Sequence, residues 1–260
     1  MSAPKGVFSS ITRMGLYEPF GLQVARGQIA GHQTFQIFGY NPDVDTSEEA
    51  VWPNSSTVPH PTVASVLQIA STSTDDDGNP IGTGANTVYI SGVDGNYNTV
   101  SETVILNGTA DVATTNSYLY VNQFYVATAG TSRANAGTIT AKVGATTYDI
   151  IAIGYNNRTT ASYCVPAGYT GYMTEGLFSA GQASGSTAVT GFLKQHGPED
   201  ILRIGAVTTV NNSAAVFVFD PPYVIPEKNA ISATAIGQAA NNAVSAYFNI
   251  MLIKNDSQTP

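Results

Sequence analysis

"NAVSAYFNIMLIK" occupies residues 242–254 and carries the clearest fold signal in the chain. Apolar side chains recur at every second position, namely Val244, Ala246, Phe248, Ile250 and Leu252. A period of two is typical of a strand with one buried face, whereas an amphipathic helix repeats every three to four residues. Alanines upstream suggest a helix, but Gly237 and Asn241 interrupt that pattern. The stretch therefore predicts a long β-strand.

The rest of the chain extends this pattern. Short runs rich in Val, Ile, Thr, Tyr and Phe are separated by Gly, Pro, Asn and Asp, which is typical of a sandwich or barrel. Predicted strands lie at 63–71, 86–93, 99–106, 117–129, 137–143, 147–154, 161–166, 168–178, 187–194, 201–210, 214–220, 229–237 and 242–254. We therefore predict an all-β chain that forms a jelly-roll-like antiparallel β-sandwich.

Turn residues predict how these strands connect. Gly144 predicts a hairpin, and so do the Asn-rich turns at 107–109 and 211–213. Pro166 and Pro226 each stand between two apolar runs. Because proline donates no ladder hydrogen bond, it belongs at a strand start or a sheet edge. These two prolines predict corners at which the chain crosses between sheets.

The first sixty residues look different. They hold many large apolar side chains but follow neither a helical nor a strand period, which predicts an extended N-terminal arm over 1–60 and a β-sandwich domain over 61–260. Such an arm must bury against a partner or its own sandwich. The candidate partner-binding residues are Phe20, Val24, Arg26, Phe35, Phe38, Asp43 and Trp52. A chain lacking residues 1–50 is expected to fold but to lose its partner.

Composition restricts the function. Charged residues make up 11% of the chain, the net charge is −8, and Lys and Arg together number ten. Nucleic-acid binding needs clustered cations and is not expected. No membrane span and no signal peptide are predicted, so the protein is expected to mature where it is made. The single cysteine, Cys164, is expected to be a small buried apolar residue.

No catalytic, metal-binding or cofactor-binding motif stands out, so we do not expect an enzyme. The sequences starting at Asp75 and Asp94 begin like calcium loops but lack the required Gly and Glu, which favours Asx turns. Scattered acidic residues leave a polysaccharide-degrading sandwich as an alternative.

Three stretches resemble a family of tailed-bacteriophage virion structural proteins: "LQVARGQIAGHQTFQIFGYNPDVDTSEEAVWP" (22–53), "VSETVILNGTADVATTNSYLYVNQFYVATAG" (100–130) and "YCVPAGYTGYM" (163–173). The resemblance implies a capsid-decorating (cement) protein that forms a homotrimer. Its implied partners are the major capsid protein and sister subunits. The implied location is the capsid surface of a virion, after synthesis in the host cytoplasm. The alternative is a phage tail or fibre component with a carbohydrate-binding β-sandwich, for which Tyr97, Tyr155 and Tyr169 are candidates.

Overall fold

The computed structural model describes residues 18–182 and 187–258. Strands β1 to β16 dominate this part of the chain, beside one short helix, α2 (Phe20–Ala25), and a 3-10 turn, η1 (Asn255–Gln258). The all-β prediction is confirmed. None of the helices in the described ranges is long and apolar enough to cross a lipid bilayer.

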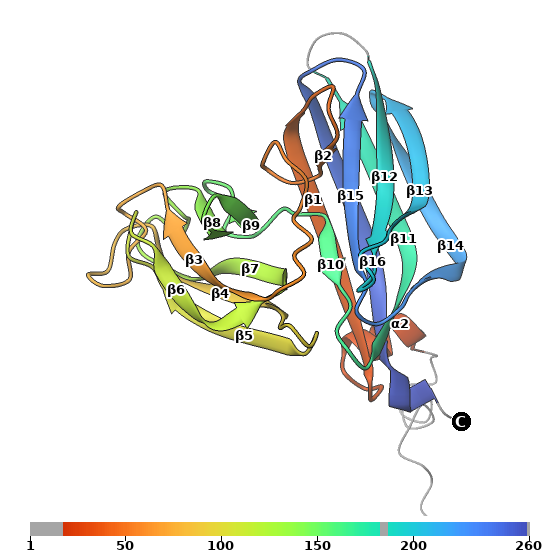
Figure 1. Cartoon of the computed structure of the whole chain (residues 1–260), viewed down its shortest axis with the longest axis horizontal. Coiled ribbons are helices and arrows are strands. Elements are labelled where there is room, and N and C mark those ends of the chain that lie inside the picture. Colours follow the sequence, from red (N-terminus) through yellow and green to blue (C-terminus); the bar gives the residue numbers. More distant parts are fainter. Residues whose placement is uncertain (1–17, 183–186, 259–260) are drawn as a thin grey trace, which may run out of the picture.

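Two antiparallel sheets pack face to face in one lobe of the molecule (Figure 1). The first sheet contains, in spatial order, β1 (His32–Val44), β16 (Asn242–Lys254), β11 (Tyr169–Gly181) and β14 (Ser213–Ile225). The second contains β10 (Ser162–Cys164), β15 (Ala230–Gly237), β12 (Ala188–His196) and β13 (Leu202–Asn211), with β2 (Glu49–Ala50) also paired to β15.

The strand order of these sheets is that of a jelly roll. When residues 51–161 are set aside and β2 and β10 are counted as one strand, the chain has eight strands here. Numbered in chain order, they form sheets 1-8-3-6 and 2-7-4-5. This is the arrangement of two Greek keys wrapped into a double-sheet jelly roll. The jelly-roll prediction is confirmed.

Side chains from both sheets fill the space between them. β16 contributes the five alternating residues from Val244 to Leu252, and all of them are buried. They pack in one cluster with residues that include Phe178, Leu193 and Ile231. Burial of each large side chain contributes about 1.5–3 kcal/mol. The strand predicted over 242–254 is therefore confirmed, with its apolar face in the core.

A second sandwich forms the other lobe (Figure 1). One sheet contains β6 (Val112–Tyr118), β3 (Ser65–Ser71), β8 (Ile139–Val143) and β9 (Thr146–Ile151). The other contains β5 (Thr99–Ile105), β4 (Ala85–Val93) and β7 (Tyr120–Ala129). The two sheets share a separate core that includes Leu67, Ile90, Tyr118, Phe124 and Ile139. The single sandwich domain predicted over 61–260 is therefore two sandwiches.

The second lobe is inserted into the middle of one jelly-roll strand. Val51 donates its N–H to the carbonyl of Ala233 (3.0 Å), and the N–H of Ala233 donates to the carbonyl of Ala161 (2.8 Å). The chain thus leaves the edge of β15 at Val51 and returns to it at Ala161, opposite the same residue, Ala233. β2 and β10 are therefore successive parts of one edge strand. Gly39 of β1 packs here, where a Cβ would lie 2.4 Å from the carbonyl of Val51. Because the chain enters and leaves the inserted lobe at neighbouring points, the insertion leaves the jelly-roll fold intact.

Residues 20–52 do not form an extended arm away from the sandwich. β1 pairs with β16 from His32 to Val44 and is an integral strand of the jelly roll. The strand was missed because Phe35 and Ile37 begin an alternation that Gly39 and Asn41 then interrupt. Removal of residues 1–50 would take away this strand, so we now expect such a chain to lose the jelly-roll fold. Residues 1–17 of the predicted arm lie outside the described residues.

The turn predictions have mixed outcomes. Gly144, with a φ of 57°, joins the paired strands β8 and β9 as predicted. Both proline corners are confirmed, because Pro166 leads from β10 to β11 and Pro226 leads from β14 to β15, each in the opposite sheet. The hairpins predicted at 107–109 and 211–213 are wrong, since the flanking strands belong to different sheets. The strand predicted over 117–129 is divided between β6 and β7.

Candidate interaction surfaces

Two of the predicted partner-binding residues are buried in their own chain, and a third, Phe35, is partly buried. Trp52 is 0% exposed, packs with Val58 and Ile150, and donates its indole N–H to the carbonyl of Ser56 at 2.8 Å. Val24 of α2 is buried as well. The ring of Phe35 lies against that of Tyr163, with a centroid separation of 5.3 Å. Trp52 and Val24 thus stabilise the subunit rather than face another protein, whereas Phe35 packs against the core and keeps part of its surface exposed.

The other four predicted residues remain accessible but do not form one cluster. Phe20 is 44% exposed on α2, where Arg26 forms an ion pair with Glu18. Phe38 is 49% exposed on β1. Asp43 is exposed near the opposite end of β1 from α2, more than about 30 Å along the strand from His32. The structure therefore places Phe20 and Arg26 together and Asp43 apart.

An open groove separates α2 from the outer face of the first jelly-roll sheet. Its volume is about 650 Å³, and it is lined by Gly21, Ala25, Thr34, Gln36, Thr174, Asn249 and Met251. Phe20 and Leu22 are exposed on the same helix. We call Phe20, Leu22 and this groove the α2 face. Leu22 was not among the predicted residues, although it follows Phe20 by two positions.

A second hollow lies between the two lobes. This cleft has a volume of about 260 Å³ and is lined by Gln36, Ile37, Phe38, Asn122, Gln123, Tyr125, Asn157, Arg158, Thr159 and Thr160. Its lining combines two aromatic rings with several amides and hydroxyls. Of the three tyrosines suggested for a carbohydrate platform, Tyr155 is well exposed, whereas Tyr97 and Tyr169 pack against buried clusters.

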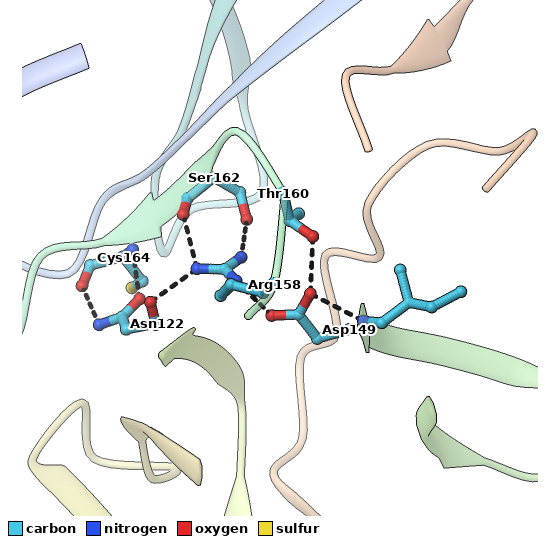
Figure 2. A network of polar contacts seen from close by, with 7 residues as sticks. Asn122, Asp149, Arg158, Thr160, Ser162 and Cys164 are labelled. Carbon is cyan, nitrogen blue, oxygen red and sulfur yellow. Dashed lines mark hydrogen bonds and ion pairs between the residues drawn. The ribbon is translucent and has the colours of Figure 1, made fainter. Parts of the chain in front are cut away.

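A buried polar network anchors the inserted lobe to the jelly roll (Figure 2). Arg158 forms an ion pair with Asp149 of β9 at 2.5 Å and donates to the carbonyls of Asn122 (2.6 Å) and Ser162 (3.2 Å). Burial raises the pKa of Asp149, and the guanidinium of Arg158 opposes that shift. One guanidinium thus joins β7 and β9 of the insert to β10.

Asn122 completes this junction. Its amide donates to the carbonyl of Cys164 at 2.9 Å and accepts the N–H of Cys164 at 2.8 Å, as a neighbouring strand would (Figure 2). Cys164 itself is buried, as predicted. Burial raises the pKa of its thiol, so the thiol stays protonated at neutral pH. Among the described residues, no group of three or more His, Cys, Asp and Glu side chains could hold a metal ion.

Two histidines meet at the same junction. The ring of His60, in the segment leading to the insert, lies 4.3 Å from that of His196 at the end of β12. His196 pairs with Asp200 at 2.8 Å, and the hydroxyl of Tyr120 lies 3.4 Å from its Nδ1. Burial and the nearby His196 lower the pKa of His60 to about 4. A neutral imidazole therefore sits between the lobes at physiological pH.

The open side of the jelly roll, formed by β13 and β14, exposes a set of apolar side chains that sequence reasoning missed. The exposed members on these strands and their approaches are Ile201, Leu202, Ile204, Val207, Val216, Val218 and Val224. The signal was present in the continuous apolar run from Ala214 to Phe219. A strand that is apolar on both faces is expected to be covered on both faces.

Comparisons with known proteins find little similarity. No family model matches the chain, and no curated protein matches it. Among solved structures, it is similar to infectious bursal disease virus strain Gt, with 12% identity over 94% of this chain and 80% of that chain and a TM-score of 0.24. The VP2 subviral particle of infectious bursal disease virus gives 12% identity, coverages of 87% and 73%, and a TM-score of 0.23. These scores carry no argument about fold or role, so the jelly roll is assigned from strand order alone.

Proposed function

We infer that the chain is a virion structural protein that decorates and stabilises the outer surface of a phage head. Support comes from the three sequence stretches that resemble phage virion proteins and from the jelly-roll fold, which viral capsid proteins share with lectins and other families. The observation that carries the proposal is the α2 face, where Phe20 and Leu22 are exposed beside a groove of about 650 Å³. Exposed apolar side chains next to a hollow are typical of a protein-binding surface.

The α2 face supplies the contact with the major capsid protein in this proposal. Phe20 and Leu22 are the apolar anchors, and Arg26 at the end of α2 gives a polar contact at the rim. Phe38 lies along the same strand as the groove residues Thr34 and Gln36. Binding to the assembled shell but not to free capsid subunits would stabilise the shell by mass action. The net charge of −8 is compatible with an outer surface that does not meet DNA.

Point variants test this role without removing β1. We expect Phe20→Asp and Leu22→Asp each to weaken binding to purified heads that lack this protein by about 30-fold or more. Ile81→Asp is the control, because Ile81 is an exposed aliphatic residue in the inserted lobe. Co-sedimentation with heads measures occupancy. Full occupancy by both α2 variants would exclude the α2 face as the capsid contact.

A carbohydrate-binding role is the second candidate, and the cleft between β1 and β7 favours it. Phe38 and Tyr125 offer aromatic faces, while Gln36, Gln123 and Asn157 offer amide donors and acceptors to sugar hydroxyls. A glycan array tests this role, with Tyr125→Ala expected to abolish any signal and Tyr155→Ala, outside the cleft, to retain it. A chain that binds no glycan on a broad array of bacterial surface polysaccharides contradicts this second role.

A further inference from the structure

The outer face of the first jelly-roll sheet carries an apolar row that crosses all four strands. Phe38 of β1 lies opposite Tyr247 of β16. Leu177 of β11 lies between Tyr247 and Val216 of β14. Phe178, the neighbour of Leu177 along β11, is buried in the core, and side chains alternate along a strand, so the row points away from the core. Phe38 is 49% exposed at one end of the row, and Val216 is 60% exposed at the other.

A second apolar row crosses the same face. Tyr172 of β11 lies between Met251 of β16 and Val224 of β14, and Val224 is 51% exposed. Between the two rows, Val218 of β14 lies opposite Glu175 of β11, and both side chains are exposed. We call the part of this face on the last two strands the β11–β14 face, and its members are Tyr172, Glu175, Leu177, Val216, Val218 and Val224.

The β11–β14 face has the character of a covered surface. On β14, Phe217 and Phe219 pack against the core while Val216 and Val218 point outward, so the strand is apolar on both sides. A strand with two apolar faces is typically buried on both, and exposed apolar patches mark binding surfaces. The one charged member of this set, Glu175, is acidic. An occupant should therefore be apolar and carry a cation.

The first 17 residues of the chain have this composition. They lie outside the described residues, and their sequence includes Val7, Phe8 and Ile11 together with two cations, Lys5 and Arg13, but no Asp or Glu. The rest of the chain holds the other eight Lys and Arg residues and all 18 Asp and Glu residues, so its net charge is −10. Residues 1–17 and the body of the protein are therefore oppositely charged and attract each other.

Residues 1–17 also join the described chain beside this face. They precede α2, and Gly21 and Ala25 of α2 line the groove over the same side of the sheet, together with Met251. Met251 is the strand partner of Tyr172 in the β11–β14 face. A segment of 17 residues spans up to about 56 Å, whereas the longest strands of the sheet, with 13 residues, span about 43 Å. Residues 1–17 can therefore reach every part of the β11–β14 face.

We propose that residues 1–17 bind the β11–β14 face of their own subunit. Their apolar side chains cover Leu177, Val216 and Val218, and one of their two cations lies beside Glu175. Covalent attachment holds the segment near the face at an effective concentration of about 1 mM. An intrinsic dissociation constant of about 0.1 mM then keeps the face covered for about nine-tenths of the time. The capsid anchors on α2 stay outside this contact, so the inference does not depend on the proposed function.

The reactivity of an engineered cysteine tests the cover. Val218→Cys places a thiol on the face, and the native cysteine, Cys164, is buried and stays protonated. Phe8→Asp combined with Ile11→Asp should speed modification of Val218→Cys by N-ethylmaleimide in the full chain by about 10-fold. Ile81→Cys is the matched control, because Ile81 is 78% exposed and Val218 is 76% exposed, and its rate should not change. Circular dichroism confirms that each variant is folded. An unchanged rate at Val218→Cys overturns the proposal.

A charge reversal tests the contact with Glu175. Lys5→Glu combined with Arg13→Glu should also speed modification of Val218→Cys, and the addition of Glu175→Lys should slow it again. A lysine next to a thiol lowers the pKa of that thiol and by itself speeds modification, so this effect cannot produce the restored protection. Failure of Glu175→Lys to slow the reaction overturns the assigned polar contact.

Protein concentration and added phage heads identify any other occupant. Protection by residues 1–17 of the same chain is independent of concentration between about 0.1 and 10 µM. Protection that grows with concentration would assign the face to a second copy, and protection that appears only with heads would assign it to the capsid protein. Either result overturns the inference, whereas full coating of heads by Phe20→Asp and Leu22→Asp chains with a covered face would refute the proposed function alone.

Discussion

The imidazole rings of His60 and His196 lie 4.3 Å apart and join the segment that enters the inserted lobe to the end of a jelly-roll strand. The Nδ1 atom of His60 is buried without a hydrogen-bond partner. The ionisable side chains around it are those of His196, Asp200 and Lys194, and the ring of Tyr120 lies 6.0 Å away. Protonation of His60 would place a positive charge in a buried site near Lys194, whose ammonium group is paired with Glu48, and the carboxylate of Asp200 offsets only part of that cost.

We expect this arrangement to make the protein less stable in acid. The pKa of His60 is about 4 in the folded chain, whereas the unfolded chain has the ordinary histidine pKa of 6.5. Above pH 6.5 both states are neutral at His60, whereas between pH 6.5 and 4 the unfolded state takes up the proton first. Stability therefore falls as the pH drops through this window, by on the order of 3 kcal/mol in total. Urea unfolding at a series of pH values measures the change.

Replacement of the imidazole separates this effect from general acid denaturation. His60→Gln and His60→Phe should both reduce the loss of stability between pH 6.5 and 4, even if they differ from each other at pH 7. An unchanged pH profile in both variants would show that His60 is not responsible.

Loss of the buried guanidinium should destabilise the junction between the lobes. Arg158→Met leaves the carboxylate of Asp149, which is 0% exposed, without its counter-ion. Removal of one partner from a buried ion pair typically costs about 3–5 kcal/mol. We expect the double variant with Asp149→Asn to lose less than the sum of the two single variants, as measured by urea unfolding in a double-mutant cycle. Strict additivity would mean that the pair is not coupled.

Asp76 is predicted to organise the loops of the inserted lobe. Its buried carboxylate accepts hydrogen bonds from the hydroxyl of Ser71 (2.5 Å) and from the backbone N–H groups of Ala85 (2.7 Å), Ala136 (2.8 Å) and Gly137 (2.9 Å). Asp76→Asn would replace one acceptor oxygen of the carboxylate by an NH2 group, which cannot accept hydrogen bonds from these donors. The change should lower the free energy of unfolding by about 3 kcal/mol. Asp75→Asn, one residue away and exposed, is the control and should change it little. Equal effects in thermal denaturation would contradict this role.

The insertion point should tolerate no side chain at residue 39. A Cβ on Gly39 would lie 2.4 Å from both the carbonyl of Val51 and the Cβ of Ala161, so Gly39→Ala must displace backbone at the junction. We expect a loss of about 2 kcal/mol or more from such overpacking. Gly21→Ala is the opposite case, because nothing lies within 4 Å of the new methyl group, and alanine favours the helix by up to about 1 kcal/mol. A stable Gly39→Ala chain would mean that the junction relaxes freely.

Local sequence patterns predicted the strands that have one face in the core and the other toward solvent. The alternation in 242–254 identified β16, and the two prolines identified the crossings between the jelly-roll sheets. The candidate site was predicted less well. Phe20 and Phe38 are exposed as a partner contact requires, but Trp52 and Val24 are core residues, since sequence shows that an apolar side chain must be buried without showing by what.

The sequence by itself determined that this is a β protein with strongly alternating strands, low charge and sheet-crossing corners, because side-chain period and turn chemistry are local properties. Only the tertiary structure decided that the N-terminal segment supplies an edge strand of the jelly roll, and that residues 65–151 form a second sandwich inserted within another edge strand. It also decided that β13 and β14 each leave one edge unpaired in the described part of the chain. These features depend on which strands pair across long separations. Pairing is set by the packing of whole sheets, and no single stretch of sequence encodes it.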